Sequence, residues 1–82
     1  MSTPEVEAAR ARLKRIFSEV FEDSGVEYSD SLSRETLQEW DSLGHIRLIS
    51  ATEEEFGVQF TIEEIERLTS AAQLLERLAR ST

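Results

Sequence analysis

The sequence predicts an all-α fold, a small bundle of three main helices plus one short helix, with a long loop between the first two helices. Apolar residues recur at spacings of three and four near the start and in the middle of the chain, which gathers them on one face of a helix. Serine and threonine, which favour helix starts, stand at or just before these segments. β-Branched residues are scattered, and no hairpin signal such as Asn-Gly occurs. We therefore expect helices and no strands.

The first helix is expected to run from Pro4 to about Asp23. Thr3 can cap its free backbone N–H groups, and Pro4 suits the first helical position because its missing N–H would be unpaired there in any case. The letters DSG at residues 23–25 then interrupt the helix. The residues that form its apolar face are Val6, Ala9, Leu13, Ile16, Phe17, Val20 and Phe21. This stripe gives the helix a surface for packing.

Residues 24–41 follow neither the period of a strand nor that of a helix, and serine and aspartate recur through them. We expect a long ordered loop. The apolar residues that would hold it on the core are Val26, Leu32, Leu37 and Trp40. A loop of this length without regular structure is unusual in so small a domain and is usually functional.

The second helix is expected to begin at Ser42, which can serve as its N-cap, and to end near Phe56, where Gly57 is a stop signal. A helical wheel separates its residues into two faces. The core-facing set is His45, Leu48, Ile49, Thr52 and Phe56. The solvent-facing set is Leu43, Arg47, Ser50 and Glu54, with Ile46 on the flank.

Two further helices are predicted from capping patterns. Thr61 and Glu64 form a possible capping box for a short helix that ends near Arg67. Ser70 and Gln73 form a second possible box at the start of the final helix. The inward-facing residues of that helix are expected to be Leu74, Leu75 and Leu78.

Composition limits the class of protein. We expect one domain, residues 1–82, held together by packing alone, because the absence of cysteine excludes disulfides and thiolate zinc sites. The formal net charge of −8 argues against nucleic acid and anionic membrane as partners and favours a basic protein. No apolar run is long enough for a signal peptide core or a membrane span. We expect a cytoplasmic monomer.

Enzyme templates match poorly. The chain has one histidine and no glycine-rich phosphate loop. Ser42 and His45 share a helix face, but nothing nearby in the sequence orients the imidazole or builds an oxyanion site. The acidic run at residues 53–55 lacks the alternating oxygen ligands of a calcium loop, and a solvated helix face explains it better. We expect no catalytic residue and no metal site.

The order of these motifs resembles an acyl carrier protein over nearly the whole chain. The letters DSL, which are Asp41, Ser42 and Leu43, open a helix that ends in EEEFGV. A long loop precedes it, and a short helix and LTSAAQLLERL follow. The resemblance implies that Ser42 carries a 4'-phosphopantetheine arm, flanked by Asp41 and Leu43. A separate phosphopantetheinyl transferase would attach the arm from coenzyme A, and its thiol would hold acyl groups as thioesters.

The resemblance also implies partner enzymes that perform the chemistry. These would be an acyl-loading or adenylating enzyme and a ketosynthase, acyltransferase or other acyl-processing enzyme. The expected docking surface comprises Leu43, Ile46, Arg47, Ser50, Glu53, Glu54, Glu63 and Glu66. We expect Trp40 to anchor the loop rather than contact cargo, and His45 to be a hydrogen-bonded structural histidine rather than a group that assists the phosphate.

Three departures from the fatty-acid-synthesis pattern favour a discrete carrier of a specialised, polyketide-like pathway. Gly44 and Arg47 stand where those carriers commonly place acids, and Ser50 stands where an apolar residue is common. Two alternatives remain: a carrier of aminoacyl or small hydroxyacyl units, and an unmodified acidic helical adaptor that binds a basic partner. The sequence does not identify the cargo or the pathway.

Overall fold

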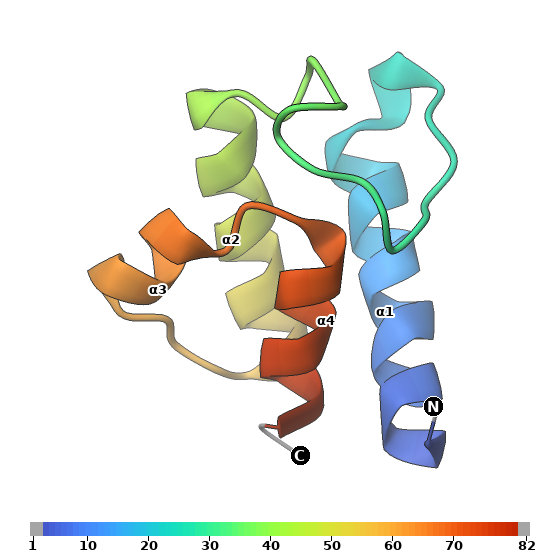
Figure 1. Ribbon diagram of the computed structural model, residues 1–82, viewed down its shortest axis with the longest axis vertical. Coiled ribbons are helices and arrows are strands. Elements are labelled where there is room, and N and C mark those ends of the chain that lie inside the picture. Colours follow the sequence, from blue (N-terminus) through green and yellow to red (C-terminus); the bar gives the residue numbers. More distant parts are fainter. Residues whose placement is uncertain (1–2, 81–82) are drawn as a thin grey trace.

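The computed structural model describes residues 3–80 except for the side chain of residue 23, so the two residues at each end of the expected domain lie outside the described part. Its elements are α1 (Pro4–Val20), the 3₁₀ turn η1 (Glu22–Ser24), α2 (Ser42–Phe56), α3 (Ile62–Arg67) and α4 (Ala71–Arg80). Helix α1 packs against both α2 and α4, while α3 projects from one side of the bundle (Figure 1). Within residues 3–80 the one strand-like pairing is an isolated bridge between Ser33 and Ser70. The all-α prediction is confirmed.

Helix α1 begins where the sequence predicts and ends three residues earlier than expected. The Thr3 hydroxyl accepts a hydrogen bond from the Val6 N–H at 3.2 Å, which confirms the cap. After Val20 the chain tightens into η1, and the Ser24 hydroxyl donates to the Phe21 carbonyl at 2.7 Å. A side chain that takes a backbone carbonyl in this way competes with further helical turns.

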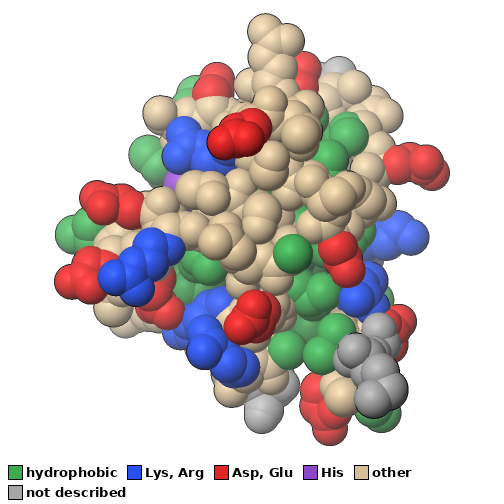
Figure 2. All heavy atoms as spheres, viewed as in Figure 1, with side chains coloured by type: hydrophobic (Ala, Val, Ile, Leu, Met, Phe, Trp, Pro, Cys, Tyr) green, Lys and Arg blue, Asp and Glu red, His purple; other side chains and the backbone are tan. Residues whose placement is uncertain are grey.

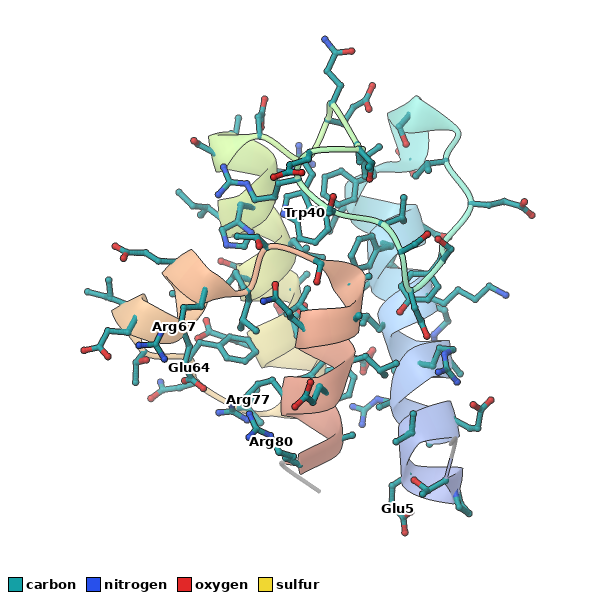
Figure 3. All side chains as sticks on the ribbon, viewed as in Figure 1. Glu5, Trp40, Glu64, Arg67, Arg77 and Arg80 are labelled. Atoms are coloured by element: carbon teal, nitrogen blue, oxygen red, sulfur yellow. The ribbon has the colours of Figure 1, made fainter. Side chains whose placement is uncertain are left out.

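The core lies between α1, α2 and α4 and includes the long loop. The loop residues Leu37 and Trp40 are buried, and Val26 and Leu32 pack partly buried against the same cluster, as the sequence predicts. Figure 3 shows the Trp40 side chain beneath the loop, between α1 and α2. Its indole meets the Phe17 ring edge-on with centroids 5.3 Å apart. The loop is therefore an ordered part of the core.

Backbone hydrogen bonds fix the loop to the junction of α3 and α4. The Arg34 N–H donates to the Thr69 carbonyl at 3.0 Å, and the Ala71 N–H donates to the Leu32 carbonyl at 2.8 Å. These bonds join segments more than thirty residues apart. They hold the loop across the bundle without forming a sheet.

A network of three polar side chains fixes the other end of the loop to α1. The Arg10 guanidinium donates to Asp30, and the Tyr28 hydroxyl donates to the same carboxylate at 2.8 Å. The hydrogen bond from Arg10 is the main cause that lowers the pKa of Asp30, with a smaller contribution from Tyr28. Burial, followed by the contact with Asp30, raises the pKa of Tyr28 above its ordinary value.

The predicted capping box is present at α3, whereas the start of α4 has a different hydrogen-bond pattern from the predicted one. Thr61 and Glu64 form the predicted capping box, with bonds of 3.1 and 3.0 Å. The Ser70 hydroxyl accepts from the Gln73 N–H at 3.2 Å, but the Gln73 side chain returns to the N–H of Thr69 rather than of Ser70. The three leucines predicted to face inward, Leu74, Leu75 and Leu78, are all buried.

Of the helices in residues 3–80, none has the length and apolar character that a membrane crossing would require.

Candidate functional site

The start of α2 is capped by Asp41, not by Ser42 as expected from the sequence. Asp41 is extended, and its Oδ1 accepts a hydrogen bond from the Gly44 N–H at 2.9 Å. Its carbonyl accepts from the His45 N–H at 2.8 Å and so starts the helical ladder. The Asp41 carboxylate, one residue before the helix, already accepts from one of the first-turn N–H groups that a serine cap could use. Ser42 is therefore the first residue inside the helix.

The Ser42 hydroxyl is exposed and makes no hydrogen bond to any other residue in the described part of the chain. Its own N–H and that of Leu43 belong to the first turn, where helices have no internal acceptor. Free N–H groups and the helix dipole favour a negative group at this end. The donor set fits a phosphodiester on Ser42, because the hydroxyl has no structural role and anion donors lie beside it.

His45 is a structural residue that joins three segments. It is 5% exposed, and its Nδ1 accepts from the Trp40 indole N–H at 2.9 Å. The other ring nitrogen, Nε2, lies 2.6 Å from the Ile65 carbonyl and must donate to it, because a carbonyl only accepts. Both nitrogens are thus occupied by the loop and by α3. Ser42 and His45 therefore do not form a nucleophile–base pair, because neither imidazole nitrogen is available to the serine hydroxyl.

The loop approaches α2 so closely at Gly44 that only glycine fits at this position. The sequence did not predict this contact. Gly44 is buried, and a Cβ at this position would lie 2.4 Å from the Glu39 carbonyl oxygen and 3.1 Å from the Phe21 ring. The first of these distances is too short for any side chain unless the backbone moves. The available signal was a glycine inside the first helical turn, where glycine is less favourable than alanine and close packing is one reason to find it.

Two apolar side chains near Ser42 face solvent. Leu43 is 66% exposed and Ile46 is 61% exposed, and Arg47, Ser50 and Glu54 on the same helix are also exposed. The wheel-based assignment of these faces is confirmed. Ile62, at the start of α3, is 76% exposed and was not anticipated, although an apolar residue directly after a cap in so short a helix was a possible signal.

The acidic residues of the expected docking surface differ in their structural roles. Glu54, Glu63 and Glu66 are exposed. Glu53 is half-buried, and its Oε2 accepts from the Phe60 N–H at 2.8 Å, so it also holds the loop between α2 and α3. Figure 2 shows acidic side chains over α3, next to a basic one.

An ion pair braces helix α3 against α4. In Figure 3 Arg77 points from α4 toward Glu64, and its Nε lies 2.5 Å from the Glu64 Oε2. The hydrogen bond from Arg77, followed by one from the Thr61 backbone, lowers the pKa of the Glu64 carboxyl. The described residues contain no cluster of three or more histidine, cysteine or acidic side chains that could hold a metal ion.

Within residues 3–80, this small helical bundle presents a serine hydroxyl without a hydrogen bond at a helix N-terminus, and both nitrogens of its one histidine are bonded. These are the features of a carrier protein. Residues 11–78 match the family described as the phosphopantetheine attachment site, and the chain belongs to this family. No curated protein and no solved structure matches the chain.

Membership of this family defines the general role of the protein. It is a carrier domain without catalysis of its own, and it binds 4'-phosphopantetheine covalently. Carrier domains of this kind work with a phosphopantetheinyl transferase and with acyl-processing enzymes.

Proposed function

We propose that this protein is an acyl carrier protein, residues 1–82 forming a single carrier domain, that holds acyl intermediates on a 4'-phosphopantetheine arm at Ser42. The observation that carries the proposal is the exposed, unbonded hydroxyl of Ser42 at the first position of α2. Asp41 performs the capping, so modification of Ser42 costs the helix no hydrogen bond. The described part of the chain offers no other serine that combines the DSL motif with a place at the start of a long helix.

The residues around Ser42 have separate tasks in this proposal. The Ser42 oxygen forms a bond to the phosphorus of coenzyme A that bears the pantetheine. The phosphoanhydride bond breaks, adenosine 3',5'-bisphosphate leaves, and the serine proton passes to the transferase. The first-turn N–H groups then stabilise the phosphodiester charge. The arm supplies a thiol for thioester formation, which a chain without cysteine lacks.

The pathway proposed is polyketide-like or related specialised biosynthesis rather than housekeeping fatty-acid synthesis. Two residues at the arm site support this. Gly44 is held by backbone packing, so an acid at this position would displace the loop. Arg47 is exposed and forms no ion pair within the described residues, so no carboxylate among them offsets its positive charge.

The docking surface proposed for partner enzymes is formed by Leu43, Ile46, Arg47, Ser50, Glu53, Glu54, Glu63 and Glu66. Exposed leucine and isoleucine beside the arm provide apolar contact, and the acidic residues suit a basic partner surface. The loading enzyme would be an acyltransferase or, for the aminoacyl or hydroxyacyl alternative, an adenylating enzyme.

Intact mass separates the carrier from the adaptor alternative. Purified protein is incubated with coenzyme A and a broad-specificity phosphopantetheinyl transferase. The carrier gains the mass of one phosphopantetheinyl group, whereas an unmodified adaptor gains none. Offering the holo-protein a set of acyl donors, and amino acids with adenylating enzymes, then distinguishes acyl from aminoacyl cargo by the mass of the thioester formed.

A further inference from the structure

We propose that the hollow between the end of α1 and the start of α2 holds the phosphate-proximal part of the arm, with Arg47 paired to the phosphate. This inference rests on the proposed attachment at Ser42. It assigns a binding role to residues of α1 and η1, which lie about twenty positions earlier in the chain.

The hollow lies at the same end of the molecule as the attachment site. Figure 1 shows η1 and the start of α2 at one end of the bundle. The residues that line the hollow are Val20, Phe21, Ser24, Glu39, Asp41, Leu43, Gly44 and Arg47. Two of them, Asp41 and Leu43, are the direct neighbours of Ser42.

The volume of the hollow suits a segment of the arm rather than the whole of it. The space measures about 210 Å³, below the roughly 300–1,000 Å³ of clefts that bury a whole drug-sized ligand. A segment of that size includes the phosphate and the first few groups that follow it. The thiol end would remain outside, where partner enzymes can reach it.

The lining matches the chemistry of that segment. After the phosphate and one methylene group the arm carries a carbon with two methyl groups, followed by a hydroxyl and an amide. Val20, Phe21 and Leu43 offer apolar contact for the methyl groups. The exposed carboxylate of Glu39 offers an acceptor for the hydroxyl and the amide N–H.

Arg47 resolves an electrostatic conflict in the hollow. A phosphodiester held in this hollow lies near the carboxylates of Glu39 and Asp41, which line it and repel the negative charge. Arg47 is the one cation among the lining residues, and it forms no ion pair within the described residues. A guanidinium matches a phosphate in charge and in hydrogen-bond geometry. Because the arm is covalently attached, even a weak contact is populated at a high effective concentration.

The test compares backbone amide NMR spectra of the apo- and holo-protein, without any partner enzyme. Residues 41–44 will shift on modification whatever the arm does, so the readout is Val20, Phe21 and Ser24. We expect these three amides to shift in wild type and to shift at most half as much in Arg47→Gln. Arg67→Gln, an exposed arginine on α3 that does not line the hollow, is the matched control and should behave as wild type.

Two results would overturn the inference. One is a holo-protein whose shifts are confined to residues 41–44, which means that the arm does not enter the hollow. The other is a set of shifts at Ile46 and Ile62 without change at Val20 and Ser24, which places the arm on another face. Intact mass confirms the holo state first, so failure of modification itself is seen separately and rejects the proposed function instead.

Discussion

Gly44 shows how one missing side chain positions the attachment site. Its φ angle is not positive, so the backbone conformation alone does not demand glycine. The demand comes from the Glu39 carbonyl, which occupies the place of a Cβ at 2.4 Å. The loop can therefore lie directly on the first turn of α2 and place Asp41 as the cap.

We predict that Gly44→Ala destabilises the protein although alanine is the better helix former. Replacing a helical glycine by alanine normally stabilises by about 0.5–1 kcal/mol, whereas forced overpacking costs about 1–3 kcal/mol. The net effect should be a lower free energy of unfolding, measured by urea titration. Ser50→Ala, at an exposed position of the same helix, is the control and should change stability by less than about 0.5 kcal/mol. A Gly44→Ala protein more stable than wild type would show that the loop is not held there.

At the scale of elements, Trp40 and His45 connect the long loop to α2 and α3. The indole N–H, the two imidazole nitrogens and the Ile65 carbonyl form one chain of hydrogen bonds, which is buried at the indole and part-buried at Ile65. Such a chain is strong when every member is satisfied and costly when one partner is lost.

We predict that Trp40→Phe lowers the free energy of unfolding by more than the loss of ring volume explains. The substitution leaves the His45 Nδ1 buried without a donor, at a cost of about 1–3 kcal/mol. Tyr28→Phe is the matched control, because it removes the hydrogen bond that the hydroxyl of another aromatic residue donates at a half-buried position. It should lower the free energy of unfolding by less. If chemical denaturation gives the two variants the same loss in free energy of unfolding, the Trp40–His45 hydrogen bond contributes no more to stability than the Tyr28 bond.

The sequence predicted these elements well where local chemistry decides them and less well where tertiary contacts do. Periodicity and capping residues set the starts of α1 and α3 and the end of α2 at Gly57. The early end of α1 depends on Ser24 bonding to Phe21, and the cap of α2 depends on Asp41 competing with Ser42. The packing of Gly44 against residue 39 involves a loop of irregular shape, which no periodic pattern encodes.

For the whole molecule, the excess of carboxylates over cations governs the response to pH and salt. The formal net charge is −8 at neutral pH. Self-repulsion of this size destabilises a compact state and is reduced by protonation or by screening. Protonation of Asp30 and Glu64 at lower pH has the opposite effect on stability, because it weakens their pairs with Arg10 and Arg77.

We predict a thermal midpoint that rises with added salt and rises at first as the pH falls below 7, then declines. Asp30 and Glu64 have folded pKa values below their ordinary values of 3.8 and 4.5, so each stabilises the fold above those values. That contribution is lost as the pH falls through the lowered folded pKa values. Melting curves from pH 7 to pH 2 at two salt concentrations measure both effects. A midpoint that falls steadily from pH 7, or that ignores salt, would contradict the role of self-repulsion.

The distribution of surface charge should also control which partner enzymes the protein works with. We predict that Arg47→Glu raises kcat/KM several-fold with a ketosynthase of fatty-acid synthesis, using malonyl-loaded holo-protein. Arg47 offsets negative charge beside the arm that a basic partner surface would contact, and charge reversal restores that negative charge. Arg80→Glu, at the exposed end of α4, changes net charge equally and is the control. If the two variants have the same kcat/KM, only net charge matters and Arg47 has no local role.

The most direct test of the account is to locate the arm after modification. Wild type, Ser42→Ala and Ser50→Ala are incubated with coenzyme A and a phosphopantetheinyl transferase, followed by intact mass and peptide mapping. Because Asp41 caps α2, Ser42→Ala should keep its stability within about 0.5 kcal/mol of wild type and yet gain no arm. Wild type and Ser50→Ala should each carry one arm on the peptide that contains Ser42. An arm on Ser42→Ala, or on any other residue of the wild-type protein, would contradict the central claim.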